Sequence, residues 1–157
     1  MLYEQIRRYA ARLLGNAGAN AGVGEDIAQE VFLRLEQQRS TIQQLQPWAY
    51  RTARNLVIDR FRRDGKIQSA DGLPDNLPAD ATRFNPAILA EKKEILEMIE
   101  RKMNELSPRH REVLRLKFQE GLKYAQIAEV LGEPVTTIAW LIHEALDKLR
   151  KELNVSH

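Results

Sequence analysis

The chain has 157 residues, of which 43% are hydrophobic and 29% charged, with a net charge of +2 and no cysteine. This composition allows a packed core and excludes wholesale disorder, a disulfide scaffold and sites that depend on thiolates. No apolar run reaches the roughly 18 residues of a membrane span, and Met1–Gln5 lacks the layout of a signal peptide, so we expect a soluble cytoplasmic protein.

Helical periodicity predicts three helices in the first 63 residues. Apolar residues recur at helix spacing in the first, and Gly15 follows as a stop signal: Leu2, Ile6, Tyr9 and Leu13. A flexible stretch from Gly15 to Gly24 leads into a second helix over 25–38, whose apolar face holds Ile27, Val31 and Leu35. A polar segment, 39–46, precedes a third helix opened by Pro47, which packs inward through Ala49, Ala53, Leu56 and Val57.

The composition changes after residue 63. Residues 64–80 have no helical period and are dense in Gly, Pro, Asp and Asn, which predicts a linker over 64–84. Helical signals resume at Asn85-Pro86 and continue through Ile95, Ile99, Met103 and Leu106, and Ser107-Pro108 starts another helix. No segment shows a sustained period of two. The sequence therefore predicts an all-α protein, with small helical domains at 1–63 and 85–157 joined by a flexible linker.

Residues 124–143 have the spacing of a helix-turn-helix unit. Gly132 allows the tight turn, Ala128 is small where the helices approach, and five apolar residues close the core: Ile127, Leu131, Val135, Ile138 and Leu141. Glu133 departs from the pattern, because that position is commonly apolar. The spacing favours DNA binding over a plain helical hairpin, with a recognition helix from Pro134 to about Leu153.

Several side chains of that helix are expected to point outward: Thr136, Thr137, Trp140, His143 and Glu144. Thr hydroxyls and an imidazole can read base edges or phosphates. Trp140 could contact a thymine methyl group or fold over a neighbouring helix.

Three blocks together resemble a known family: residues 24–35, residues 47–63, and the pair 106–114 with 120–128. In this order they resemble bacterial RNA polymerase sigma factors of the extracytoplasmic-function (ECF) group, in the sigma-70 family. That group keeps only sigma region 2, here 1–63, and sigma region 4, here 85–157. The resemblance implies core RNA polymerase (β′ coiled coil and β flap), promoter DNA and an anti-sigma factor as partners. We expect no cofactor and no metal, since no histidine pair has metal-ligand spacing with a carboxylate.

The resemblance also implies site residues. The β′ coiled coil would be bound by Asp26, Gln29, Glu30, Phe32 and Arg34. The −10 element would be bound and opened by Trp48, Tyr50, Arg51, Arg54, Asn55, Arg60, Arg62 and Arg63, with Phe61 as a further stacking candidate. Segment 39–46 corresponds to the loop that captures a flipped base. The −35 element would be bound by Lys123, Tyr124, Thr136, Thr137, Trp140 and His143, and the flap by Val113, Leu114 and Phe118.

One departure concerns the recognition helix, where Ala139, Leu141 and Glu144 stand at positions that are often Lys or Arg in the family. Glu144 would repel phosphate, so −35 binding is expected to be weak and to use backbone contacts from Lys123, Arg109, Arg111 and Arg115. A sigma mimic that sequesters an anti-sigma regulator is an alternative, and a conventional helix-turn-helix regulator is another. The three scattered histidines and the absence of a phosphate-binding glycine loop argue against an enzyme.

Overall fold

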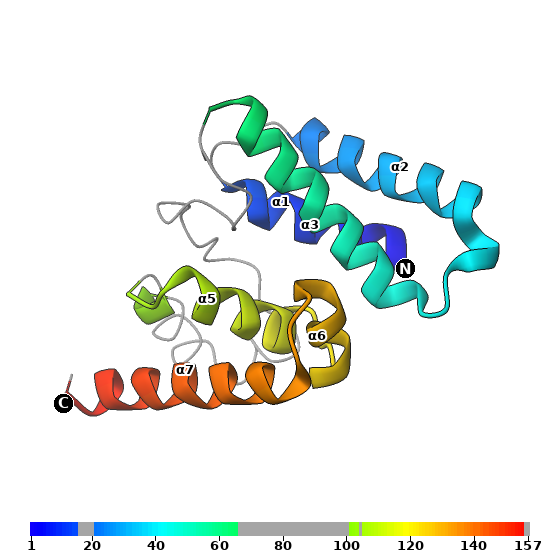
Figure 1. Ribbon diagram of the computed structural model, residues 1–157. Helices are drawn as coiled ribbons and strands as arrows, with labels where there is room; N and C mark the ends of the chain where they lie inside the picture. Colours follow the sequence, from blue (N-terminus) through cyan, green and yellow to red (C-terminus); the bar gives the residue numbers. More distant parts are fainter. Residues whose placement is uncertain (16–20, 66–100, 104, 156–157) are drawn as a thin grey trace. The chain divides into compact units, whose positions relative to one another are not determined.

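The computed structural model describes residues 1–15, 21–65, 101–103 and 105–155, and every regular element in those ranges is helical (Figure 1). This confirms the predicted all-α class. The chain divides into two compact units, the first built on α1 to α3 and the second on α5, η3, most of α6, and α7. The predicted linker beyond residue 65, the helix start at Asn85-Pro86, and Ile95 and Ile99 lie outside the described residues.

Helix α1 (Leu2–Leu14) ends where the sequence predicts. Gly15 adopts a φ of 57°, a left-handed conformation that favours glycine, and its N–H donates to the carbonyl of Ala11. The buried face includes Ile6, Tyr9 and Leu13, whereas Leu2 is only half-buried. The apolar period thus identified both this helix and the face that it buries.

Helix α2 (Ala21–Gln38) begins four residues before the expected start, so the prediction that the stretch up to Gly24 is flexible is wrong for 21–24. Glycine is a poor helix former in isolation. Here Gly24 is buried against α1, and a β-carbon at this position would lie 3.2 Å from the carbonyl oxygen of Arg7 and 3.3 Å from Cβ of Ala11. The close approach of two helices therefore explains the glycine.

Helix α3 (Leu45–Arg63) completes a bundle in which each of the three helices contacts the other two. A short 3₁₀ turn, η2 (Arg39–Thr41), precedes it, and Pro47 lies in its first turn. Tyr50 packs edge-on against Tyr9, with ring centroids 5.0 Å apart. The core face of α3 consists of Ala49, Tyr50, Ala53, Val57, Ile58 and Phe61, while Leu56 is half-buried.

The second unit contains α5 (Pro108–Leu114), a π-helical turn η3 (Arg115–Gln119), residues 124–128 of α6 (Tyr124–Leu131), and α7 (Val135–Val155). Ser107 caps α5, since its hydroxyl accepts from the backbone N–H of His110 at 3.3 Å, and Pro108 follows. Met103 and Leu106 are buried as predicted. The Ser-Pro signal in the sequence therefore marked a true helix start.

The turn between α6 and α7 has the predicted helix-turn-helix geometry. Gly132 has a φ of 69°, and Ala128 is 9% exposed. Ile127, Ile138 and Leu141 are buried, but Val135 is 46% exposed, so its assignment to the core was wrong. Val135 is the first residue of α7, where the chain has just left the turn.

Candidate polymerase and nucleic-acid interfaces

The polar face of α2 presents the residues expected at the polymerase. Asp26 and Gln29 are exposed, and Glu30 accepts a hydrogen bond from Arg34 at 3.0 Å. Phe32 is half-buried, with its ring 5.4 Å from that of Tyr3. Leu33, which is 56% exposed, was missed by sequence reasoning. Leu33 does not share the helical face of Ile27, Val31 and Leu35. That position could have identified it as an exposed apolar residue.

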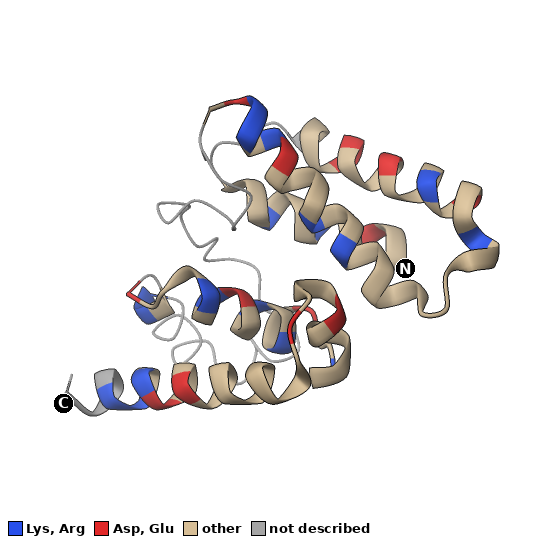
Figure 2. Cartoon of the chain, viewed as in Figure 1, with Lys and Arg blue, Asp and Glu red and all other residues tan. Residues whose placement is uncertain are grey.

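The arginines of α3 give this helix an exposed basic surface, visible as blue bands in Figure 2. Arg51, Arg62 and Arg63 are exposed together with Asn55, whereas Arg54 and Arg60 are half-buried. Arg62 lies 3.4 Å from Asp59, the one acidic residue in α3. A net positive, solvent-facing helix of this kind can neutralise phosphates.

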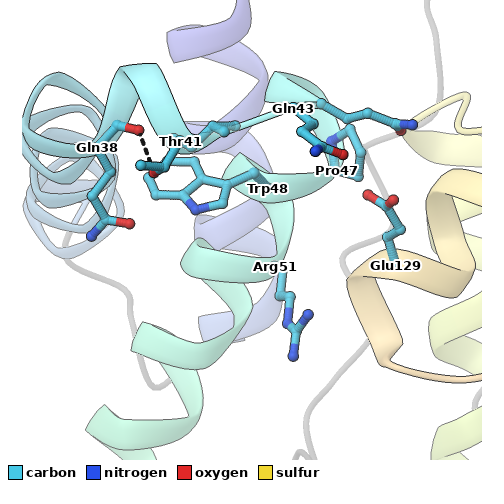
Figure 3. Close-up of a pocket in the computed structure, with 9 residues that line it drawn as sticks. Gln38, Thr41, Gln43, Pro47, Trp48, Arg51 and Glu129 are labelled. Carbon is cyan, nitrogen blue, oxygen red and sulfur yellow. Dashed lines mark hydrogen bonds between the residues drawn. The ribbon is translucent and has the colours of Figure 1, made fainter.

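Trp48 lies at the start of α3, beside the connection from α2. Its indole is half-buried, and Figure 3 shows it next to Thr41. The Thr41 hydroxyl donates to the carbonyl of Gln38 at 2.8 Å, which holds the η2 turn. Arg51 extends away from the indole one turn further along α3. A flat ring and a cation therefore occur in successive turns of the same helix.

Two aromatic side chains expected to stack on unpaired bases are instead in the core. Tyr50 is 0% exposed and Phe61 is 1% exposed. They share a helical face with Ala53 and Val57, because residues 50, 53, 57 and 61 are spaced by three and four. Neither ring can reach a base in this structure, so Trp48 is the aromatic residue of α3 with access to solvent.

In the second unit, the residues expected to contact DNA lie at the start of α6 and in the first half of α7. Lys123 is exposed, and Tyr124 is half-buried with Nζ of Lys117 5.0 Å from its ring centroid. Thr136, Trp140 and His143 are exposed on α7. Trp140 is 58% exposed, so it does not fold over a neighbouring helix of its own unit. Thr137 is half-buried.

Four residues of α5 and η3 are less accessible than expected. Arg111 and Arg115 are 6% and 8% exposed, so they are poorly placed for DNA backbone contacts. Val113 and Leu114 belong to the core, which leaves the 47% exposed Phe118 as the accessible member of the expected flap-binding set.

Glu133 in the turn and Glu144 in α7 each lie close to a cation. Arg109 donates to Glu133 at 2.8 Å, which ties the start of α5 to the turn and gives the acid at this position a partner. Glu144 lies 3.5 Å from Lys148 and 3.1 Å from Nε2 of His110. Its charge is therefore partly neutralised within the unit, and the expected repulsion of phosphate is reduced.

His110 is buried where α5 faces α7. Its Nδ1 lies 2.6 Å from the Ser107 hydroxyl, while Nε2 approaches Glu144 without the alignment of a good hydrogen bond. Burial lowers the pKa of His110, and the positive charge of Lys148 lowers it further, although Glu144 opposes both effects. The folded state therefore favours the neutral form of the His110 ring.

Two family models match this chain. Sigma-70 region 2 matches residues 1–67, and Sigma-70, region 4 matches residues 96–149. The ECF RNA polymerase sigma factor SigW of Bacillus subtilis (strain 168) is 31% identical over 96% of this chain and 83% of its own length. The ECF RNA polymerase sigma factor SigL of Mycobacterium tuberculosis (strain H37Rv) is 31% identical over 97% of this chain and 86% of its own.

A solved structure has a similar fold. The sigma factor RpoE, in complex with the anti-sigma factor NepR from Bartonella quintana, matches with a TM-score of 0.61 over 99% of this chain and 94% of that chain, at 18% identity. Together with the family models and the relatives, the helical units place this chain among the ECF sigma factors of the sigma-70 family. It binds core RNA polymerase and promoter DNA and directs promoter-specific transcription initiation.

In the described part of the chain, no helix is long and apolar enough to cross a bilayer. Within the same residues, no group of three or more His, Asp or Glu side chains is placed to hold a metal ion. Sigma factors act as initiation factors for the polymerase, and the polymerase performs the chemistry.

Proposed function

We propose that the first unit carries both the polymerase-binding and the −10 surfaces of this sigma factor. The polar face of α2 would bind the β′ coiled coil, and α3 would bind and open the −10 element beside Trp48. The observation that carries this proposal is the exposure of Arg51 and Arg63 on the helix that also presents the half-buried indole. Opening a duplex needs cations for the phosphates and a flat surface for an unpaired base.

The second unit would bind the −35 element through the start of α6 and the exposed face of α7. Supporting this role, Lys123, Thr136 and Trp140 are all accessible at the end of the unit where the helix-turn-helix lies. Phe118 would contact the flap. In domain terms, region 2 spans 1–63, a linker 64–84 and region 4 85–157.

We also infer that the protein works in the cytoplasm, performs no chemistry of its own and has an anti-sigma partner. The structurally similar RpoE was solved in complex with such a partner. In the first unit, Leu33 and Leu45 are 56% and 43% exposed, which offers apolar contacts to a protein. Co-expression with candidate membrane or cytosolic regulators, followed by co-purification of the full chain, tests this inference.

The central test is run-off transcription with purified core polymerase on genomic fragments, combined with a pull-down of the polymerase. We expect promoter-specific transcripts. An Arg51→Ala/Arg63→Ala variant should still bind core polymerase but lower promoter opening about tenfold or more, because two charge-assisted contacts to phosphate are lost.

Arg8→Ala is the matched control, since Arg8 is an exposed arginine of α1 outside the proposed DNA surface. It removes a positive charge from the same unit and should leave opening unchanged. If the wild-type chain failed to bind core polymerase, the proposal would be wrong. If the double variant opened promoters normally, α3 would have no role in −10 binding.

A further inference from the structure

The first turns of α7 present an apolar and uncharged face to solvent. Trp140 is 58% exposed and Val135 is 46% exposed. Thr136, Trp140 and His143 are spaced by four and three residues, so they lie along one stripe of the helix. These are the turns of a recognition helix that meet base edges when a helix-turn-helix unit docks in a major groove.

This face has no cation of its own. No Lys or Arg occurs between Lys123 and Lys148, and residues 135–143 of α7 carry no charged side chain, so the start of this helix is tan in Figure 2. An arginine–guanine pair, which is the commonest specific contact in the major groove, is therefore not available here. Attraction to phosphates must come from residues outside the stripe.

Three acids flank or continue the stripe, and each lies close to a cation. Asp147, which follows His143 by four residues on the same face, is 3.2 Å from Lys151. Glu133 is paired with Arg109 at 2.8 Å, and Glu144 lies close to both Lys148 and His110. Both carboxylates are about one-third exposed, at 35% and 31% of the side chain. The exposed surface between them is formed by hydroxyl, imidazole and apolar groups.

We propose that α7 recognises the methyl groups of thymine bases, with Trp140 as the main contact. Thymine alone among the four DNA bases carries a methyl group in the major groove, and apolar side chains contact it directly. The proposal rests on the proposed −35 binding of region 4 and states which chemistry provides its selectivity. It assigns that selectivity to burial of a methyl group on the indole.

The test uses holoenzyme made from the full chain and a promoter mapped by run-off transcription. Each thymidine of the upstream element, on either strand, is replaced by deoxyuridine, which removes the methyl group and keeps base pairing. At one or two positions we expect binding to weaken about fourfold, the change that corresponds to burying one methyl group. Deoxyuridine in the spacer should have no effect.

Variants then connect this effect to the side chain. Trp140→Ala should bind thymidine and deoxyuridine promoters equally, while Trp140→Leu, which keeps an apolar contact, should retain part of the difference. Lys151→Ala, at an exposed site near the other end of α7, is the control and should leave the ratio unchanged. Circular dichroism of each variant checks that the helices remain folded.

The outcomes separate the two proposals. If transcription is promoter-specific but no upstream deoxyuridine weakens binding, methyl recognition is wrong and the sigma-factor role is unaffected. Methyl recognition is also wrong if the element contains no thymine, or if Trp140→Ala keeps the thymidine preference. If that variant keeps the preference but no longer captures a regulator, Trp140 contacts a protein partner and not DNA. If no promoter-specific transcripts form with wild-type protein, the proposed −10 and −35 functions are wrong as well.

Discussion

The helices α3 and α7 contain surfaces proposed for the same promoter, but their charges differ. Helix α3 carries five arginines and one aspartate, whereas residues 135–143 of α7 carry no Lys, Arg, Asp or Glu. Charge attracts a protein to any DNA, while contacts with base edges distinguish one sequence from another. If both surfaces bind DNA as proposed, we expect region 2 to provide most of the electrostatic attraction and region 4 to add selectivity.

The largest expected change is a loss of stability, and it tests whether Tyr50 lies in the core of the first unit while Trp48 lies at its surface. Tyr50→Ala should lower the free energy of unfolding by about 3–5 kcal/mol, as expected when a large buried aromatic residue is truncated. Urea denaturation of the full chain measures this loss. Trp48→Ala should cost less stability but lower promoter opening about tenfold, since stacking of one base contributes about 1–3 kcal/mol.

A contrary result for this pair would change the comparison. If Tyr50→Ala left stability intact and abolished promoter opening, the Tyr50 ring would be at the DNA and α3 would rotate when the polymerase binds. Tyr50→Phe is a useful companion, because it keeps the ring contact with Tyr9 and removes only the hydroxyl.

Salt dependence tests the comparison directly. Each neutralised phosphate contributes about 0.9 to the slope of log affinity against log salt concentration. The Arg51→Ala/Arg63→Ala variant should therefore reduce that slope by about two. Trp140→Ala should weaken binding and leave the slope unchanged. Filter binding of holoenzyme between about 50 and 200 mM salt gives both values. A change of slope for Trp140→Ala would contradict the uncharged role of α7.

The smallest effect concerns pH and the second unit alone. The pKa of His110 is lowered in the folded state, so below its ordinary value of about 6.5 the unfolded chain binds the additional proton first. Stability contributed by neutral His110 is present above that pH and is lost as the pH falls toward the lowered pKa. Lys148 and Arg109 oppose protonation, and Glu144 favours it.

His110→Gln removes this titration and keeps a polar side chain. Thermal unfolding at pH 5.5 and 7.5 should show a smaller drop in Tm at acid pH for the variant than for the wild type. An identical drop in both proteins would show that other groups control the acid sensitivity.

Much of the fold could be predicted from the sequence because the chain combines clear helical periods with strong signals for where helices start, end and turn. Gly15 ends α1, Ser107 caps α5 and Gly132 forms the turn, each for a local backbone reason. The early start of α2 could not be predicted in this way. It depends on Gly24 meeting α1, and a contact between two helices overrides a low intrinsic propensity.

The candidate sites were predictable in part. The accessible arginines of α3 and the exposed stripe of α7 follow from helix spacing, and the same spacing could have placed Tyr50 and Phe61 in the core. The burial of Arg111 and Arg115 has no comparable sequence signal. The pairing of Arg109 with Glu133 joins residues 24 positions apart, and only the folded arrangement brings their charges together.

The glycine that lets α1 and α2 approach has a practical consequence. A β-carbon added at Gly24 would meet the main chain of α1 at Arg7. Helix α1 would therefore have to shift by a few tenths of an ångström. Gly24→Ala would alter none of the proposed binding residues themselves while loosening the bundle that holds them. Such a change is a rational starting point for a heat-sensitive allele, with which a whole set of promoters could be silenced by warming the culture.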